Sequence, residues 1–225
     1  PFTIAPQITA VTVFADTADV GSSPVIWRAD ATGQRVDWTD ISTNVSAVNI
    51  RLSTSGVGGF PGTLLASKPS TINGVNSATD LVVPSTLSTN ALIRVEDDVA
   101  SFVTADSATF NVLGKQTIVA FPSNNVYVGN TATLIKWNKT GLLPGGADYS
   151  VEITVDYNDN LFQADADTIV LNSSVAAAQG PAGWAWEDPV DPLVNGVADR
   201  VTETAYLRVR DAEPTRQAAG YEAIY

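Results

Sequence analysis

Side chains that bind cations are concentrated in one short stretch of this chain. The run Asp156-Tyr157-Asn158-Asp159-Asn160 carries a side-chain oxygen at every position. Ca²⁺ takes roughly six to eight oxygen ligands from carboxylates, amides and carbonyls. Asp156, Asn158 and Asp159 are therefore candidate calcium ligands. A polar hairpin loop is the alternative interpretation, because the run directly follows residues 151–155, in which apolar and polar side chains alternate.

Paired carboxylates are the second chemical possibility. Two Asp or Glu side chains that face each other across a cleft can hydrolyse a glycosidic bond. Acidic clusters occur at Glu96-Asp97-Asp98 and at Glu187-Asp188. Both are expected at strand ends, where acidic clusters are usually solvated loops. We therefore expect no catalytic residues and no enzymatic activity.

The composition excludes many other activities. The 225 residues include no His and no Cys, so Ser-His-Asp triads, Cys-His nucleophiles and zinc sites built on these ligands are impossible. A net charge of −12 disfavours nucleic acid as a partner. No run approaches the roughly 18 apolar residues of a membrane helix, so no membrane insertion is expected. Apart from calcium at the Asp156 loop, no cofactor is expected.

Aromatic side chains offer a candidate sugar-binding surface. Trp184, Trp186 and Tyr206 could stack against sugar rings. Trp27 and Trp137 align with each other in the internal repeat described below, which predicts buried core positions. Trp38, like Trp184, has no apolar counterpart in the other repeat, so these two tryptophans are the ones to test for exposure.

Three Asn-x-Ser/Thr sequons are candidate glycosylation sites. They begin at Asn44, Asn138 and Asn172, in expected loops or strand ends. They are meaningful only if the protein passes through a glycosylating compartment.

The elements that position these residues are expected to be β-strands. Apolar residues alternate with polar ones in short runs rich in Val, Ile and Thr, which is typical of strands with one buried face. Gly, Pro and Asn cluster between the runs and predict turns. The expected strands are Ile8–Phe14, Val48–Leu52, Leu92–Val95, Thr117–Phe121, Val151–Val155 and Tyr206–Val209.

The sequence repeats itself with a period of about 110 residues. The block Ala91–Asp97 matches Ala205–Asp211 and shares Arg-Val-x-Asp with it, and Val25-Ile26-Trp27 aligns with Ile135-Lys136-Trp137. The recurrence of Arg94 and Asp97 as Arg208 and Asp211 suggests a structural role. A repeat of this length with about seven strands predicts one β-sandwich. The fold class is therefore all-β, with two tandem Ig-like, seven-stranded, Greek-key sandwiches.

The predicted domains are residues 5–113 and 114–225. Residues 1–4 match residues 109–112, the closing strand of the first repeat. They are expected to be either the closing strand of a preceding unit or a strand that docks on the open sheet edge of a neighbouring molecule.

The repeated pattern resembles the Ig-like modules grouped with the N-terminal domain of fungal Ser-Thr-rich, glucan-related cell-wall proteins, which also recur in repetitive bacterial surface proteins. The matching blocks are Val128-Gly129, Ile135-Lys136-Trp137, Val48–Leu52, Thr79–Pro84, Ala91–Asp97 and Ser107–Val112. The resemblance implies a secreted, wall-associated structural or adhesive module.

The sequence thus predicts an acidic repeat module of a large extracellular or cell-surface protein, in a spacer, filament or adhesion role. Its expected partners are neighbouring copies or adjacent domains of the same array. The alternative is a sandwich that binds carbohydrate or another cell-wall polymer. Solvent-facing tryptophans on one sheet would favour the alternative, and buried tryptophans would favour the array.

Overall fold

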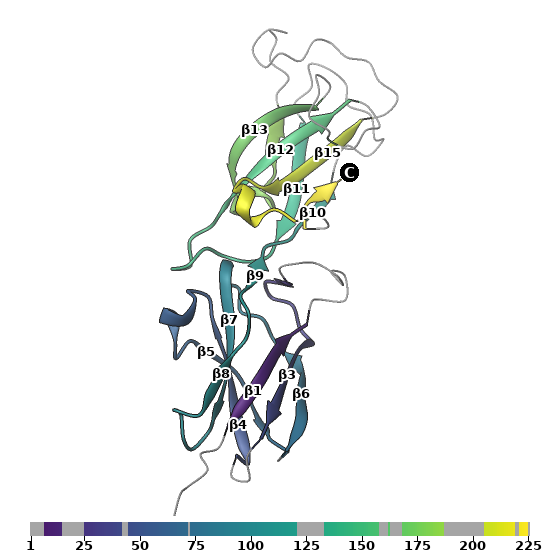
Figure 1. Ribbon diagram of the computed structural model, residues 1–225. Coiled ribbons are helices and arrows are strands. Elements are labelled where there is room, and N and C mark those ends of the chain that lie inside the picture. Colours follow the sequence, from purple (N-terminus) through teal and green to yellow (C-terminus); the bar gives the residue numbers. More distant parts are fainter. Residues whose placement is uncertain are drawn as a thin grey trace, which may run out of the picture. The chain divides into compact units, whose positions relative to one another are not determined.

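The chain is all-β. The computed structural model describes residues 7–14, 25–41, 45–71, 73–120, 133–157, 162, 168–186, 205–218 and 221–224 (Figure 1). Its regular elements there are strands and three short 3-10 helices, η1 (Val57–Gly59), η2 (Ala177–Gln179) and η3 (Pro214–Arg216). No helix in this described part is long and apolar enough to cross a membrane. Contacts divide the chain into two compact units, Pro1–Leu113 (unit 1) and Gly114–Tyr225 (unit 2).

Unit 1 contains two sheets. The first has three antiparallel strands in the order β1-β3-β6. The second has the order β2-β9-β7-β4-β5, with β8 paired to β7, and only its β2–β9 pair is parallel. The strands are β1 (Ile8–Val13), β2 (Ile26–Arg28), β3 (Gln34–Asp40), β4 (Ala47–Ser53), β5 (Thr63–Pro69), β6 (Gly74–Leu81), β7 (Ser88–Asp97), β8 (Thr104–Asp106) and β9 (Phe110–Leu113).

The apolar alternation of the sequence becomes the core of unit 1. Val48, Ile50 and Leu52 of β4 are buried, as predicted from their period of two. The Trp27 ring packs edge-on against Phe110 of the closing strand, with the ring centroids 4.8 Å apart. Trp27 Nε1 donates to the backbone oxygen of Phe14 over 2.7 Å, so this buried indole is satisfied.

Unit 2 repeats this organisation. Its three-stranded antiparallel sheet has the order β10-β11-β14, and its four-stranded antiparallel sheet has the order β13-β12-β15-β16. The strands are β10 (Gln116–Ala120), β11 (Thr133–Lys139), β12 (Ser150–Asp156), β13 (Thr168–Ala176), β14 (Trp184–Trp186), β15 (Tyr206–Asp211) and β16 (Ala223–Ile224). Each of the six runs expected from the sequence contains a strand.

The internal repeat recurs in the strand register. Val48 of β4 lies opposite Asp97 of β7, and Val151 of β12 lies opposite Asp211 of β15. The two strand pairs therefore superimpose residue for residue, with Arg94 and Arg208 at the same position. The alignment of Ala91–Asp97 with Ala205–Asp211 is confirmed at the level of strand pairing.

The predicted match of Trp27 with Trp137 is wrong. Trp137 lies on β11, the middle strand of its three-stranded sheet, and the strand in that place in unit 1 is β3, which carries Trp38. A bulge in the first strand accompanies both of these tryptophans. Unit 1 contains two short segments that resemble Ile135-Lys136-Trp137, one ending at Trp27 and one ending at Trp38. Comparison of short segments therefore could not tell which of the two is the counterpart.

The last strand of unit 2, β16, has its counterpart in β8 and not in closing strand β9. Ile224 lies opposite Arg208 in β16, as Asp106 of β8 lies opposite Arg94. β16 therefore corresponds to β8, the strand before closing strand β9. The predicted strand at residues 1–4 lies outside the described residues.

Candidate functional site: the charged face of the long sheets

The outer face of the strand pair β4–β7 carries paired charges. Arg51 of β4 forms an ion pair with Glu96 of β7. Arg94 Nε and Nη2 donate to the two carboxylate oxygens of Asp106 over 2.7 and 2.8 Å, a bidentate pair. The Arg94 guanidinium also lies over the ring of Phe60, 3.9 Å from its centroid. We call this surface, and its counterpart in unit 2, the charged face.

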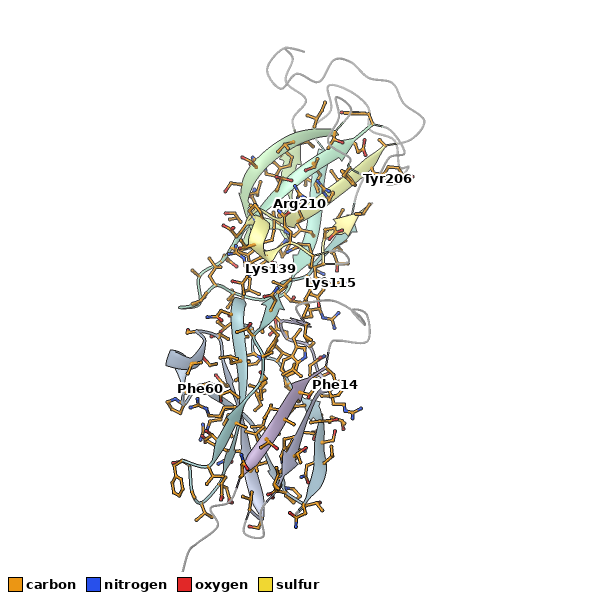
Figure 2. All side chains as sticks on the ribbon, in the orientation of Figure 1. Phe14, Phe60, Lys115, Lys139, Tyr206 and Arg210 are labelled. Atoms are coloured by element: carbon orange, nitrogen blue, oxygen red, sulfur yellow. The ribbon has the colours of Figure 1, made fainter. Side chains whose placement is uncertain are left out.

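The charged face of unit 2 lies on β12 and β15. Arg210 Nε donates to Glu152 Oε1 over 2.8 Å, and an Arg208 terminal nitrogen lies 3.9 Å from the same oxygen. The Arg208 guanidinium stacks over the ring of Phe162, 4.2 Å from its centroid. Figure 2 shows Arg210 within the sheet of unit 2 and Tyr206 at the opposite end of this unit from Lys115 and Lys139.

A phenylalanine over the repeated arginine is common to both units, and the sequence analysis missed it. Phe60 lies in the β4–β5 connection, on the periphery of unit 1 in Figure 2. Phe162 lies in the equivalent β12–β13 connection. Each connection contains one Phe, but their distances from the preceding strand differ, so an ungapped comparison does not align them. A planar guanidinium over an aromatic ring gains cation–π and packing energy.

The ion pair at the centre of the face is built from different residues in the two units. Glu96 and Arg210 occupy the same position of the register, and their partners, Arg51 and Glu152, are on the neighbouring strand in each case. The acid thus lies on β7 in unit 1 and on β12 in unit 2. Arg51 corresponds in register to Thr154, and Glu152 corresponds to Asn49, so the two partners lie at different positions. In each unit a pair within the sheet accounts for these charges.

Arg208 is less well compensated than Arg94. Ile224 occupies the place of Asp106 opposite it. Arg208 Nε is buried and has no acceptor among the described residues. Burial, followed by the charge of nearby Arg210, lowers the pKa of the Arg208 guanidinium from its ordinary value.

The repeated aspartates hold turns. Asp97 Oδ1 accepts the backbone N–H of Val99 over 3.0 Å, and Asp211 Oδ1 accepts that of Glu213 over 2.8 Å. The same Asp211 carboxylate also accepts two bonds from Arg216, at 2.8 and 3.0 Å. These contacts support the structural role predicted for the repeated Asp. Of the two acidic clusters considered as catalytic pairs, Glu187-Asp188 lies outside the described residues.

The calcium prediction falls partly on the described residues. Asp156 is fully buried, and its Oδ2 accepts the backbone N–H of Phe162 over 2.6 Å, which closes the β12–β13 connection. Asn158 and Asp159 lie outside the described residues. Within the described ranges no group of three or more Asp or Glu is placed to hold a metal ion. The Asp156 loop therefore stays a prediction.

Three of the five tryptophans of the chain lie in the core. Trp27 and Trp137 are fully buried, as predicted, and Trp38 is 1% exposed. Trp38 lies on the inward side of β3, and its Nε1 donates to Ser70 Oγ over 3.3 Å. Trp38 is thus not a candidate for sugar stacking. Trp184 is half-buried, and the side chain of Trp186 lies outside the described part of the chain.

Among the described residues, the most exposed large apolar side chains lie at a hairpin tip that sequence analysis did not single out. Val99 and Phe102, in the β7–β8 connection, are 87% and 83% exposed. The tip is held by backbone bonds from Asp97 N to Val103 O, 3.0 Å, and from Val103 N to Ala100 O, 2.8 Å.

Two of the three sequons lie on described strands. Asn138 is exposed on β11, and Asn172 is half-buried on β13. Asn172 Oδ1 accepts the backbone N–H of Ser174 over 2.9 Å. Asn44 lies outside the described residues.

Comparison with known proteins finds no match: no protein-family model matches the chain, and no curated protein matches it significantly.

Proposed function

We propose that the chain is a pair of tandem Ig-like, Greek-key modules from a repetitive extracellular or cell-surface protein, with a spacer or adhesive role. One observation carries the proposal. The two units share the order of the described long strands and the register of the long strand pairs, and each strand pair carries an Arg–Glu ion pair made from different residues. Retention of a cross-strand ion pair although its residues differ is what selection for the folded module itself would produce.

The ion pairs within the charged face also support a structural function. Its carboxylates bind arginines of their own sheet: Glu96 binds Arg51, Asp106 binds Arg94, and Glu152 binds Arg210. Groups that are satisfied internally are poorly suited to bind a charged ligand, because binding would first have to break these pairs.

Binding of a wall polysaccharide is the competing function. It would need flat aromatic rings in solvent, and Trp27, Trp38 and Trp137 are buried. Trp184, half-buried on β14, is the side chain on which that function would depend. Neighbouring copies or adjacent domains of the same array are the partners we propose.

Single-molecule stretching of the whole chain tests the proposal. A spacer of two independent modules should unfold in two force peaks, each releasing about 38 nm of contour length for roughly 110 residues at about 3.5 Å per residue. The same protein should show no binding on an array of wall polysaccharides. One peak for the whole chain, or polysaccharide binding that Trp184→Ala abolishes, would overturn the proposal.

A further inference from the structure

The two units end their long sheets with equivalent strands. β5 in unit 1 and β13 in unit 2 each pair with the neighbouring long strand, β4 or β12, and among the described residues neither pairs on its other side. An edge strand presents unpaired N–H and C=O groups to any other extended chain, so folded proteins usually protect it with Lys, Pro, a bulge or a covering group.

Unit 1 has protecting residues that unit 2 lacks. Lys68 and Pro69 lie near the end of β5, opposite Val48 and Ala47 of β4. At the same register of unit 2 stand Val175, opposite Val151, and Ala176. The nine residues of β13, TIVLNSSVA, contain no charge and no proline.

The strand that lacks Lys and Pro contains a sequon. Asn172-Ser173-Ser174 lies in the middle of β13, and both serines are exposed. Val151 pairs with Val175 and Ile153 pairs with Asn172, so β13 advances by three positions where β12 advances by two. The sequon therefore forms a bulge, and β5 has none at the same place.

The atom that would carry a glycan takes no part in the contact that holds the bulge. Asn172 bonds to Ser174 N through Oδ1, and the atom that carries an N-linked glycan is Nδ2. A sugar on Nδ2 therefore does not need to break this contact. The other described sequon, Asn138-Lys139-Thr140, lies on β11, the middle strand of its sheet, and protects no edge.

We propose that Asn172 is N-glycosylated and that its glycan covers the free edge of β13, in place of the Lys and Pro that protect β5. In the reaction, Asn172 Nδ2 attacks C1 of an oligosaccharide pyrophosphate. The Nδ2–C1 bond forms, the C1–O bond to the pyrophosphate breaks, and the amide loses one proton. The inference rests on the extracellular location in the proposed function.

Glycan occupancy tests the first half of the proposal. The whole chain is secreted from eukaryotic cells behind a cleavable leader, and glycopeptide mass spectrometry measures the occupied fraction at Asn172. Wild type and Ser173→Ala, which keeps the sequon, should carry the glycan. Asn172→Gln and Ser174→Ala should lose it. A secreted wild-type protein with Asn172 unmodified would overturn the proposal.

Self-association tests the second half. Sedimentation equilibrium should find glycosylated wild type monomeric and Asn172→Gln associating with rising concentration. Ala176→Pro, added to Asn172→Gln, should restore the monomer by copying Pro69: the φ of −58° at Ala176 suits proline. If Asn172→Gln stays monomeric, the glycan does not protect the edge. Should this variant not be secreted, the folded wild type trimmed to its first sugar serves in its place, and it should associate.

Failure of this inference is distinct from failure of the proposed function. Because the leader supplies export, occupancy at Asn172 does not depend on where the native protein resides. A single unfolding peak together with a glycosylated Asn172 would refute the two-module spacer but not the glycosylation. Two unfolding peaks together with an unmodified Asn172 would refute the glycosylation but not the spacer.

Discussion

Tyr149 shows how one buried polar residue organises unit 2. It is 1% exposed, and its hydroxyl accepts from Gln116 Nε2 over 2.8 Å and donates to Thr140 O over 3.1 Å. A Cβ added at Gly114 would lie 2.9 Å from the same hydroxyl oxygen, so only glycine fits there. Burial raises the pKa of the Tyr149 hydroxyl well above its ordinary value of about 10.

The raised pKa predicts alkaline instability of unit 2. Above about pH 10 the unfolded state loses the phenolic proton while the folded state keeps it, so the free energy of unfolding falls as pH rises. Tyr149→Phe should remove this contribution. At neutral pH it should cost about 1–2 kcal/mol, because buried Gln116 loses its acceptor. Urea unfolding at about pH 8 and pH 11 measures both effects. Equal alkaline losses in wild type and variant would contradict the assignment.

Unit 1 provides the internal control for this experiment. All six tyrosines of the chain lie in unit 2. NMR resonances of unit 1 amides should therefore report the same dependence on pH in wild type and Tyr149→Phe.

Substitution of Gly180 should destabilise unit 2. A Cβ at Gly180 would lie 2.6 Å from Trp137 Nε1 and close to the Trp137 backbone oxygen. Gly180→Ala should thus destabilise unit 2 by about 1–3 kcal/mol, the usual cost of overpacking. Gly58→Ala is the matched control, because no atom lies within 4 Å of a Cβ there. Thermal unfolding of the two variants checks the difference, and equal melting temperatures would contradict it.

At the scale of elements, the paired long strands carry the repeat. β4–β7 and β12–β15 keep one register, place an arginine under a loop phenylalanine, and end in an aspartate that holds the following turn. The first strand of each unit carries a bulge beside the buried tryptophan of the middle strand of the same sheet. These shared features lie where strands contact each other, and the differences lie in the connections.

The two turn aspartates should differ in importance. Asp211→Asn removes a charge that accepts two bonds from Arg216 in a site that is 3% exposed. Loss of this partly buried pair should cost about 2–3 kcal/mol. Asp97→Asn keeps an oxygen for Val99 N and should cost under about 1 kcal/mol. Denaturant unfolding of each variant gives the comparison. A larger loss at Asp97 would contradict the proposed role of Arg216.

At the scale of the whole molecule, each unit contains its own two sheets and its own buried tryptophan. The division falls between Leu113 and Gly114, which is also where the predicted domains meet. Self-contained cores predict that each unit can fold without the other.

Separate production of residues 5–113 and 114–225 tests this independence. Each piece should give a cooperative unfolding transition and dispersed amide resonances that overlay with those of the intact chain, apart from residues next to position 113. A piece that is soluble but unfolded would show that the units depend on each other.

Local sequence determined the strands and their faces. The side chains of Val48, Ile50 and Leu52 alternate with polar neighbours, and the period of two places them on one buried side whatever the partner strand is. The recurrence of Arg94 and Asp97 as Arg208 and Asp211 likewise located the repeat, because both residues lie within one strand and its turn.

Only the tertiary structure decided the relations between strands. It matched Trp137 with Trp38 rather than Trp27 and placed Phe60 and Phe162 over their arginines. It also brought the sequon at Asn172 to a sheet edge without Lys or Pro. Each of these depends on which distant strand or loop lies alongside. Pairing partners are chosen by the packing and hydrogen bonding of the whole sheet, which no periodicity within a single strand records.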